Sequence, residues 1–293
     1  MTNPSSCCDS AQEEENSSSD CGAQSASQQQ ADDVRNKVRE SYAKVAEANN
    51  ENEACGIESS CCGVSDDIDI NTLNSLRLGY SADDLENVPE GADMGLGCGN
   101  PRAIAALAVG ETVVDLGSGG GFDAFLAARE VGVSGRVIGI DMTPNMISKA
   151  RGNADKANFD NVEFRLGEIE HLPIANDSAD VIISNCVINL SPNKAQVFKD
   201  AYRVLKSGGR LAISDVVASC EMPEDMKNDL DLYSGCMAGA SLISELEILM
   251  RDAGFTKINI SPKDDSKDFI KDWAPGKNVT DYVLSAHIEA IKP

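Results

Sequence analysis

The sequence predicts an α/β fold built on a doubly wound, mostly parallel sheet. Three observations indicate it. Short apolar runs alternate with helical segments from Glu111 onward, a glycine-rich turn follows the first of these runs, and two helix starts pair a capping residue with proline. Strands that alternate with helices form parallel sheets covered by helices on both faces. We therefore expect one α/β core with further segments attached to it.

The composition limits the class of protein. The 293 residues are 42% hydrophobic, which is enough to bury a substantial core. Residues 1–100 hold 20 acidic and 5 basic side chains, which account for −15 of the net charge of −23. This acidity disfavours nucleic acid and membrane surfaces as partners, because both carry negative charge. It fits ordinary solubility at least as well as adaptation to a salty cytoplasm.

The expected cellular compartment rests on two features that the sequence does not show. No apolar run approaches the roughly 20 residues that span a bilayer, and the opening MTNPSSCCDS has no features of a secretory signal. We expect a cytoplasmic protein. In a reducing compartment, the ten cysteines suggest ligand or redox roles and not a disulfide framework.

The N-terminal hundred residues divide into three parts. Residues 1–31 are rich in Ser, Gln, Asp and Glu without Lys or Arg, so we expect a disordered tail. Residues 31–48 predict a helix, because apolar side chains recur there at spacings of 3 and 4. The polar segment 49–67 contains three cysteines and is expected to be a loop. We group residues 32–100 as an N-terminal helix with a cysteine-containing segment.

The strands and helices of the core follow in order. Five apolar runs predict parallel strands: TVVDLG (112–117), RVIGID (136–141), VEFRLG (162–167), DVIISN (180–185) and RLAISD (210–215). Helices are expected at 123–131, 144–157 and 193–205. Thr143-Pro144 and Ser191-Pro192 each supply an N-cap followed by proline at the first helical position.

The C-terminal part adds two further strands. The run AGFTKINIS (253–261) is followed by a loop with the single tryptophan, Trp273. The last segment, DYVLSAHIEAIKP (281–293), alternates as an edge strand would. Before them, residues 225–235 are expected to form a helix whose charges face solvent.

A glycine turn follows the first strand, in VVDLGSGGGFD (113–123). Gly117, Gly119 and Gly121 allow the backbone to approach a ligand closely. A dinucleotide fingerprint, G-x-G-x-x-G, would need glycine where Phe122 stands. A pyrophosphate ligand is therefore disfavoured but stays open.

Two acids indicate the ligand. Asp115 places negative charge beside the turn, which would repel a pyrophosphate but not the ammonium or sulfonium of S-adenosylmethionine. Asp141 ends the second strand, 20 residues after Gly121, where a carboxylate can accept hydrogen bonds from both ribose hydroxyls. We expect a nucleoside-binding turn. The alternative is an ordinary strand-to-helix connection.

These motifs resemble those of class I S-adenosylmethionine-dependent methyltransferases, and specifically of arsenite methyltransferases of the microbial type, from about Leu78 to the C-terminus. Three segments carry the specific resemblance: GLGCGNP (95–101), SNCVINLSP (184–192) and KDFIKDWAPGKNVTDYVLSAHIEA (267–290). It implies a Rossmann-like, seven-stranded sheet. The S-adenosylmethionine-binding core would be residues 101–219, and residues 220–293 would supply helices that cover the active site and the final edge strands.

The resemblance also implies which residues hold the cofactor. The methionine part is assigned to Asp115, Gly117, Ser118, Gly119 and Gly121. Asp141 with Met142 is assigned to the ribose, and Gly167, Glu168 and Ile169 to the adenine. Asn185 and Asn189, which flank Cys186, could orient the cofactor or a water molecule, or could simply form the turn at the strand end.

In the resembled family the acceptor is trivalent arsenic, bound by Cys98, Cys186 and Cys236. Cys186 ends the fourth strand, where the ligand crevice of such sheets lies. Soft thiolates select thiophilic ions, although any one of these cysteines could instead be a small buried hydrophobe.

The family further implies an N-terminal redox cysteine that pairs with Cys98. Cys61 or Cys62 is our preference and Cys55 remains open. A zinc site is disfavoured there because C-x5-C-C lacks paired C-x2-C spacing. Cys220 is expected to be structural. Cys7, Cys8 and Cys21 belong to the tail.

The expected function is methylation of arsenite, or of its thiol conjugate, with thioredoxin or glutathione as reductant. Thiol-bound trivalent arsenic offers a lone pair, so a general base is not required. This agrees with His171 and His287 lying in a loop and in the last strand. A methyltransferase acting on carbon or oxygen, a non-catalytic metalloid-binding protein and a dehydrogenase are the alternatives.

Overall fold

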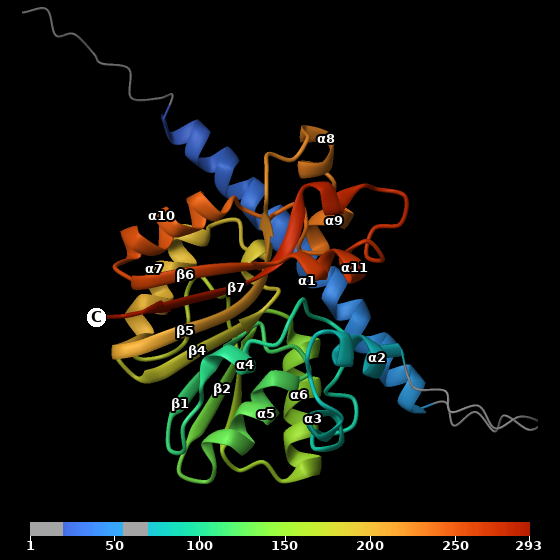
Figure 1. The fold of residues 1–293 in the computed structure, drawn as a ribbon, viewed down its shortest axis with the longest axis vertical. Coiled ribbons are helices and arrows are strands. Elements are labelled where there is room, and N and C mark those ends of the chain that lie inside the picture. The colour runs from blue at the N-terminus through green and yellow to red at the C-terminus, as the bar shows by residue number, and fades with distance from the viewer. Residues whose placement is uncertain (1–19, 55–69) are drawn as a thin grey trace, which may run out of the picture.

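The computed structural model describes residues 20–54 and 70–293 of the chain (Figure 1). Cys7, Cys8, Cys55, Cys61 and Cys62 lie outside these residues, and so does the interior of the expected loop 49–67 from residue 55 onward. The backbone of Cys21 is described but its side chain is not. None of the described helices is long and apolar enough to cross a membrane.

Seven strands form one sheet in the order β3-β2-β1-β4-β5-β7-β6. Their bounds are β1 Thr112–Leu116, β2 Arg136–Asp141, β3 Val162–Leu166, β4 Ala179–Asn185, β5 Leu205–Ala218, β6 Thr256–Lys263 and β7 Val283–Ile291. The first five are parallel, and β7 runs antiparallel to both β5 and β6. The chain reverses its direction of travel across the sheet between β1 and β4, so the ligand crevice is expected at the carboxyl ends of these strands. The predicted fold class is confirmed.

The prediction that the last strand forms an edge is wrong. β7 lies between β5 and β6, and its first four residues, Val283 to Ala286, are all buried. β6 takes the edge, and none of its residues is fully buried. The polar and apolar alternation of the last segment describes only the second half of β7. A strand buried on both faces does not need alternation.

Helices cover both faces of the sheet (Figure 1). On one face, α5 (Phe122–Val131) and α6 (Pro144–Ala157) bury Phe125 and Ile147 against Val113 of β1. On the other face, α7 (Lys194–Val204) and α10 (Ile243–Ala253) bury Phe198 and Met250. Their apolar residues recur at helical spacing, and each helix therefore presents one apolar side to the sheet.

The two predicted N-caps have different outcomes. Thr143 is the N-cap of α6 with Pro144 at the first helical position, as expected. Ser191 does not cap α7, which begins two residues later than Pro192 and is capped by the side chain of Asn193. The Ser191 hydroxyl donates instead to Glu170 at 2.7 Å. The expected helix over 225–235 is also divided, into α8 (Glu224–Lys227) and α9 (Leu230–Ser234), because Asp229 caps a new helix.

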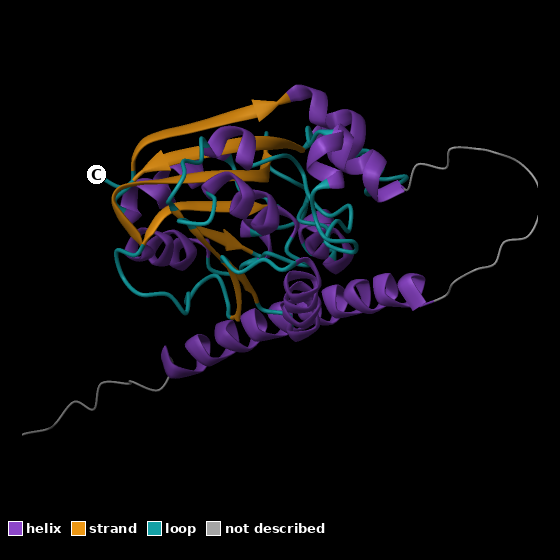
Figure 2. Ribbon diagram, turned by 90° about the horizontal axis from the view of Figure 1, so that it is seen from below, coloured by secondary structure: helices purple, strands orange, loops and turns teal. Residues whose placement is uncertain are grey.

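A 35-residue helix, α1 (Asp20–Ala54), runs along one side of the molecule and extends beyond the body at both ends (Figure 2). It begins earlier than the expected helix, so residues 20–31 of the expected disordered tail are helical. No proline interrupts this stretch, and alanine and glutamine favour helix. Its centre packs on α6 and α9, with Val38 and Ala46 buried.

Short helices complete the described chain. They are α2 Ile70–Arg77, α3 Ala82–Glu86, α4 Arg102–Ala105 and α11 Lys267–Ile270, with the 3-10 turns η1 Ile188–Leu190, η2 Asp264–Ser266 and η3 Val279–Asp281.

Candidate functional site

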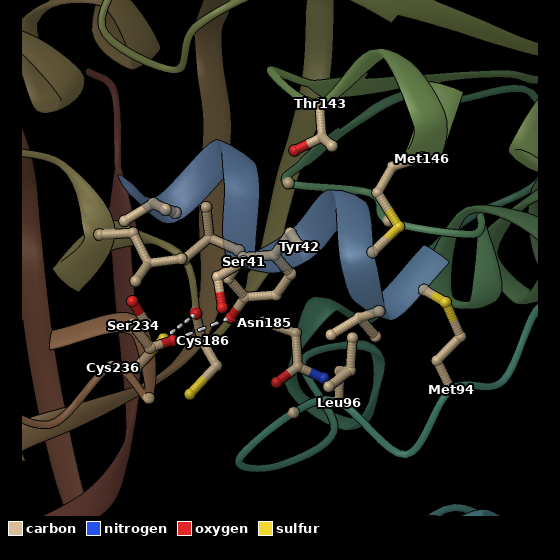
Figure 3. Close-up of a pocket in the computed structure, with 18 of the residues that line it drawn as sticks. Ser41, Tyr42, Met94, Leu96, Thr143, Met146, Asn185, Cys186, Ser234 and Cys236 are labelled. Atoms are coloured by element: carbon tan, nitrogen blue, oxygen red, sulfur yellow. Dashed lines mark hydrogen bonds between the residues drawn. The ribbon is translucent and has the colours of Figure 1, made fainter. Parts of the chain in front are cut away.

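A pocket of about 640 Å³ opens at the carboxyl ends of β1, β2 and β4. Its walls come from α1, the segment 92–97, the glycine turn, the segment after β4, α9 and the segment 273–277 (Figure 3). Both the glycine turn and two of the three predicted arsenic ligands, Cys186 and Cys236, line it. The position is the one expected for a doubly wound sheet.

The glycine turn is shaped by its backbone. Gly117 has φ +69°, and a Cβ there would lie 2.3 Å from the side chain of Val187. Asp141, at the end of β2, ties the turn to its own strand by accepting hydrogen bonds from the N–H of Gly119 at 3.0 Å and of Thr143 at 2.8 Å. A substituent at Gly117 would therefore close the gap between the two loops that follow β1 and β4.

The turn carries polar atoms that match the expected cofactor. Asp115 Oδ2 and Ser118 Oγ are buried and find no hydrogen-bond partner within the described part of the chain. Burial raises the pKa of Asp115 well above its usual range, and the nearby carboxylates of Asp123 and Asp141 raise it further. A cation at this position would relieve the burial of these charges. The residues present thus fit the ammonium and sulfonium groups of S-adenosylmethionine.

The predicted adenine residues divide into two groups. Ile169 lines the pocket, whereas Gly167 and Glu168 are not among the lining residues. Met142, which was predicted for the ribose, also lines it. Glu168 instead forms ion pairs with Arg39 at 3.1 Å and Arg35 at 3.6 Å, both on α1. These ion pairs connect α1 to the segment after β3 and hold the helix over the pocket.

Glu170 occupies the wall where Glu168 was expected. Its side chain is nearly buried, lines the pocket, accepts a hydrogen bond from Ser191 and pairs with Arg35 at 3.3 Å. It could not be predicted from the sequence, because residues 167–170 follow the end of β3 in a loop and turn, where side chains do not alternate as they do in a strand.

Asn185 lines the pocket, but its side-chain amide forms hydrogen bonds with other groups of the protein. Nδ2 contacts Gly99 O at 2.8 Å, Tyr80 Oη at 3.0 Å and Asp123 Oδ2 at 3.2 Å, and Oδ1 accepts from the N–H of Cys98 at 3.0 Å. Asn185 therefore holds the loop of Cys98 against the end of β4. Asn189 is buried and donates to Asp215, Val216 and Cys236, as expected for a turn residue.

The structure brings Cys98, Cys186 and Cys236 together. The Sγ atoms of Cys98 and Cys186 and a carboxylate oxygen of Asp215 all lie within 4.8 Å of one another. Cys236 Sγ contacts the carbonyl oxygen of Cys186 at 2.6 Å (Figure 3). All three thiols belong to one apolar cluster, with 9% or less of each residue exposed. Segments separated by about 50 to 90 residues thus converge on one thiol cluster.

The backbone at two of these cysteines is unusual. Cys186 has φ +59° and Cys236 has φ +62°, in the left-handed region that non-glycine residues seldom adopt. Such conformations cost on the order of 1–3 kcal/mol and are concentrated at functional sites. The surrounding fold maintains both, and each turns a thiol toward the pocket.

The surroundings of the three thiols disfavour their thiolate form. Burial raises the pKa of Cys98. The pKa of Cys186 is raised well above its usual range, because its contact with Cys98 and its burial outweigh the lowering effect of Cys236. The pKa of Cys236 is raised by its contact with Cys186 and then by burial. Binding of a ligand that replaces the thiol protons would therefore be favoured over ionisation of the thiols with nothing bound to them.

Tyr42 of α1 closes this end of the pocket beside Cys236 (Figure 3). Its hydroxyl donates to Ser234 O at 3.3 Å. Tyr42 is one of the apolar side chains whose spacing of 3 and 4 predicts the helix over residues 31–48, but that spacing predicts no role for it. A helix pattern shows that one side is buried without showing what covers it.

Asp215 is a further functional candidate that was not predicted from the sequence. It ends the apolar run RLAISD, so the rule that selected Asp115 and Asp141, an acid at the carboxyl end of a strand, also applies to it. Burial raises its pKa to about 6 against the lowering effect of its hydrogen bonds to backbone N–H groups.

The remaining cysteine and the histidines lie elsewhere. Cys220 is exposed, and its Sγ is 3.6 Å from Asp281 O. His171 and His287 are not among the residues that line the pocket. His171 contacts the carbonyl of Glu170, and His287 is half-buried in β7.

Comparison with known proteins gives consistent similarities. The family model of a methyltransferase domain matches residues 107–254. An arsenite methyltransferase of Halobacterium salinarum is 53% identical over 269 residues, 89% of this chain and 67% of that protein. The mouse arsenite methyltransferase is 40% identical over 186 residues, 60% of this chain and 49% of that protein. The chain thus spans about two thirds of the first relative and about half of the second.

Solved structures agree with these relatives. The crystal structure of an arsenic(III) S-adenosylmethionine methyltransferase from Chlamydomonas reinhardtii is 32% identical, with a TM-score of 0.57, and the match covers 75% of this chain and 73% of that one. A phosphoethanolamine N-methyltransferase of Haemonchus contortus in complex with S-adenosyl-L-methionine, at 19% identity and a TM-score of 0.54, covers 66% of this chain and 51% of that one. At that identity the second structure supports the fold alone.

Proposed function

Because this chain belongs to the arsenite methyltransferases, we propose that it transfers a methyl group from S-adenosylmethionine to trivalent arsenic bound by Cys98, Cys186 and Cys236. The observation that carries the proposal is that the three thiols converge, and that two of them, Cys186 and Cys236, line the same pocket as the glycine turn. Neither half alone is specific. The turn is common to many nucleoside-binding folds, and buried cysteines are common in cores.

Thiols of this kind suit arsenous acid. Three thiols displace three hydroxyls from As(OH)₃, and each leaving hydroxyl departs as water with a thiol proton. The exchange needs no free thiolate at the start, so the raised pKa values of the cluster do not oppose it. Soft sulfur ligands favour arsenic over hard cations that prefer oxygen.

The residues of the turn would hold the cofactor. Asp115 and Ser118 offer unpaired polar atoms to the methionine part, Asp141 with Met142 would hold the ribose, and Ile169 offers apolar surface to the adenine. When bound, S-adenosylmethionine supplies an electrophilic methyl group on a positively charged sulfur. Glu168 is the one adenine residue of the prediction whose side chain belongs instead to the attachment of α1.

The protein contributes mainly positioning. Thiol-bound arsenic presents its own lone pair, so no side chain has to remove a proton from the acceptor. Cys186, at the end of β4, and the turn after β1 lie on adjacent strands, which places acceptor and donor at neighbouring positions of one sheet edge. The attachment of α1 through Arg35 and Arg39 would close this space to water.

Methylation oxidises arsenic formally by two electrons, so a reductant must restore the trivalent state before another round. We assign this step to the thiols of Cys98 and of a cysteine of residues 55–62, with Cys61 or Cys62 preferred. The two thiols give two electrons to the methylated arsenic and become a disulfide, which thioredoxin or glutathione then reduces. The same thiols could receive arsenic as arsenite or from a glutathione conjugate. Such a cycle requires a reducing compartment, in keeping with a cytoplasmic protein.

The proposal is tested by arsenic speciation. Purified protein is incubated with arsenite, S-adenosylmethionine and a thiol reductant, and the products are separated by chromatography with elemental mass detection. Methylated arsenic is the expected product. Unchanged arsenite, with binding of both ligands demonstrated separately, would reduce the protein to a metalloid-binding one.

A further inference from the structure

Asp215 lies near the carboxyl end of β5, beside the thiol cluster. It is 1% exposed, and a carboxylate oxygen lies within 4.8 Å of the sulfurs of Cys98 and Cys186. A buried carboxylate is expensive unless something in the fold requires it. Its position beside the three cysteines indicates that the arsenic site is what requires the buried carboxylate.

The carboxylate is held rigidly and without a cation at contact distance. Its oxygens accept hydrogen bonds from the N–H groups of Val216 at 2.7 Å and Ile188 at 2.8 Å and from Asn189 Nδ2 at 2.9 Å. Within the described part of the chain, no lysine or arginine forms an ion pair with it. Lys194 lowers the pKa of Asp215 through space. Its Nζ donates a hydrogen bond to Gly239 O at 2.7 Å and not to the carboxylate.

The negative charge of Asp215 does not activate the thiols before arsenic binds. The Asp215 carboxylate is among the causes that raise the pKa of Cys98, Cys186 and Cys236, so it opposes formation of thiolates. A group that activated these thiols as anions would be a cation. The negative charge must therefore favour another state of the site.

The methyl transfer provides such a state. The arsenic lone pair forms the new As–C bond, the C–S bond of the donor breaks, and its electron pair stays on the donor sulfur, which becomes a neutral thioether. A neutral trithiolate of arsenic thereby acquires the positive charge that the sulfonium loses. In a dry cavity, a fixed opposite charge near the atom that gains charge lowers the barrier.

Building on the proposed function, we infer that the Asp215 carboxylate stabilises the positive charge that arsenic acquires as it is methylated. Asp215 acts through space on the sulfur-bound arsenic and is not a ligand or a base. Its hydrogen bonds to Ile188 and Asn189 also hold the turn after Cys186, so an electrostatic role must be separated from a structural one.

Asp215→Asn separates them, since it removes the charge and keeps the size. Asp200→Asn is the matched control: Asp200 is also a buried carboxylate, bonded to the N–H of Leu172 at 2.6 Å and paired with Arg203 at 2.8 Å on α7. At pH 8, the single-turnover rate of methylarsenic formation with both ligands saturating should fall about 100-fold in Asp215→Asn. Its arsenite affinity should stay within about threefold, and Asp200→Asn should keep the wild-type rate.

A second readout does not depend on turnover. Alkylation by iodoacetamide, followed peptide by peptide by mass spectrometry, should become about tenfold faster at Cys98, Cys186 and Cys236 in Asp215→Asn, because loss of the charge lowers the pKa of these thiols. Exposed Cys220 is the internal reference and should not change. Because a loosened turn would also expose these buried thiols, alkylation is followed as a function of pH, and only loss of the charge lowers the pH at which the rate reaches half its maximum.

Each other outcome overturns the inference. An unchanged transfer rate, unchanged thiol reactivity, or an equal loss in Asp200→Asn would each do so. Asp215→Ser is measured in parallel, and loss of the native circular dichroism in both Asp215 variants would make the residue structural. A wild-type protein that binds both ligands without methylating arsenic would instead overturn the proposed function.

Discussion

Replacing Asn185 by alanine tests whether this residue binds the cofactor or holds the arsenic site. The sequence left both possibilities open, since an amide at the end of β4 could serve either purpose. In the structure, Asn185 bridges the buried loop of Cys98 to β4 by bonding to Cys98 N–H and Gly99 O. We therefore expect Asn185→Ala to weaken arsenite binding far more than cofactor binding.

The size of the expected loss of stability follows from the backbone groups that lose their hydrogen-bond partner. Cys98 and Gly99 are both buried, and each backbone group that loses its partner costs about 1–3 kcal/mol. The contact of Asn185 with the Asp123 carboxylate is lost as well. The free energy of unfolding should fall by about 3 kcal/mol, within the 2–6 kcal/mol that two orphaned groups allow. Arsenite affinity should fall at least about tenfold, because 1.4 kcal/mol of ligand misplacement already has that effect.

Urea denaturation measures the stability change, and isothermal titration with arsenite and with S-adenosylmethionine measures the two affinities. Asn161→Ala is the control, since Asn161 also donates to two backbone carbonyls, Ala128 O and Gly132 O at 3.0 Å each, at a distance from the pocket. It should lose about 1–2 kcal/mol of stability and no arsenite affinity. If Asn185→Ala binds arsenite as well as wild type and loses cofactor affinity instead, the assignment of Asn185 to the arsenic site is wrong.

The remaining predictions concern the two ends of the pocket. Cys186→Ser and Cys236→Ser should each abolish arsenic methylation while S-adenosylmethionine still binds in titration calorimetry, and Cys220→Ser should keep wild-type turnover; wild-type rates in either of the first two would refute the thiol assignment. Gly117→Ala should weaken S-adenosylmethionine binding about tenfold and lower the free energy of unfolding by about 1–2 kcal/mol, since φ is positive there and a Cβ meets a neighbouring side chain; equal calorimetric affinity in both proteins would contradict this. Tyr42→Phe removes the hydroxyl that fastens α1 to the segment before Cys236, so the amides of α1 should exchange about five- to tenfold faster with solvent deuterium, in line with loss of about 1 kcal/mol; unchanged exchange would show that apolar contacts alone hold the helix.

Local sequence patterns were sufficient for much of the fold. Alternating apolar runs located all seven strands, since a strand or helix must bury an apolar side whatever lies next to it. The glycine turn and Asp115 and Asp141 could be selected because their chemistry is local to one strand end. The three cysteines of the arsenic site could be named only through a resemblance, because nothing in the spacing of Cys98, Cys186 and Cys236 says that they meet.

The sequence by itself determined which segments become strands, which turn approaches the cofactor and which residue types are available for arsenic. The tertiary structure alone decided that α1 covers the pocket, that Glu170 and not Glu168 lines it, that β7 lies inside the sheet, and that Asp215 stands against the thiols. Periodicity reports that a side chain is buried, but the partner it is buried against depends on how distant segments dock. Those contacts link residues far apart in the sequence, such as Tyr42 and Ser234, which are 192 positions apart, and only the folded chain specifies them.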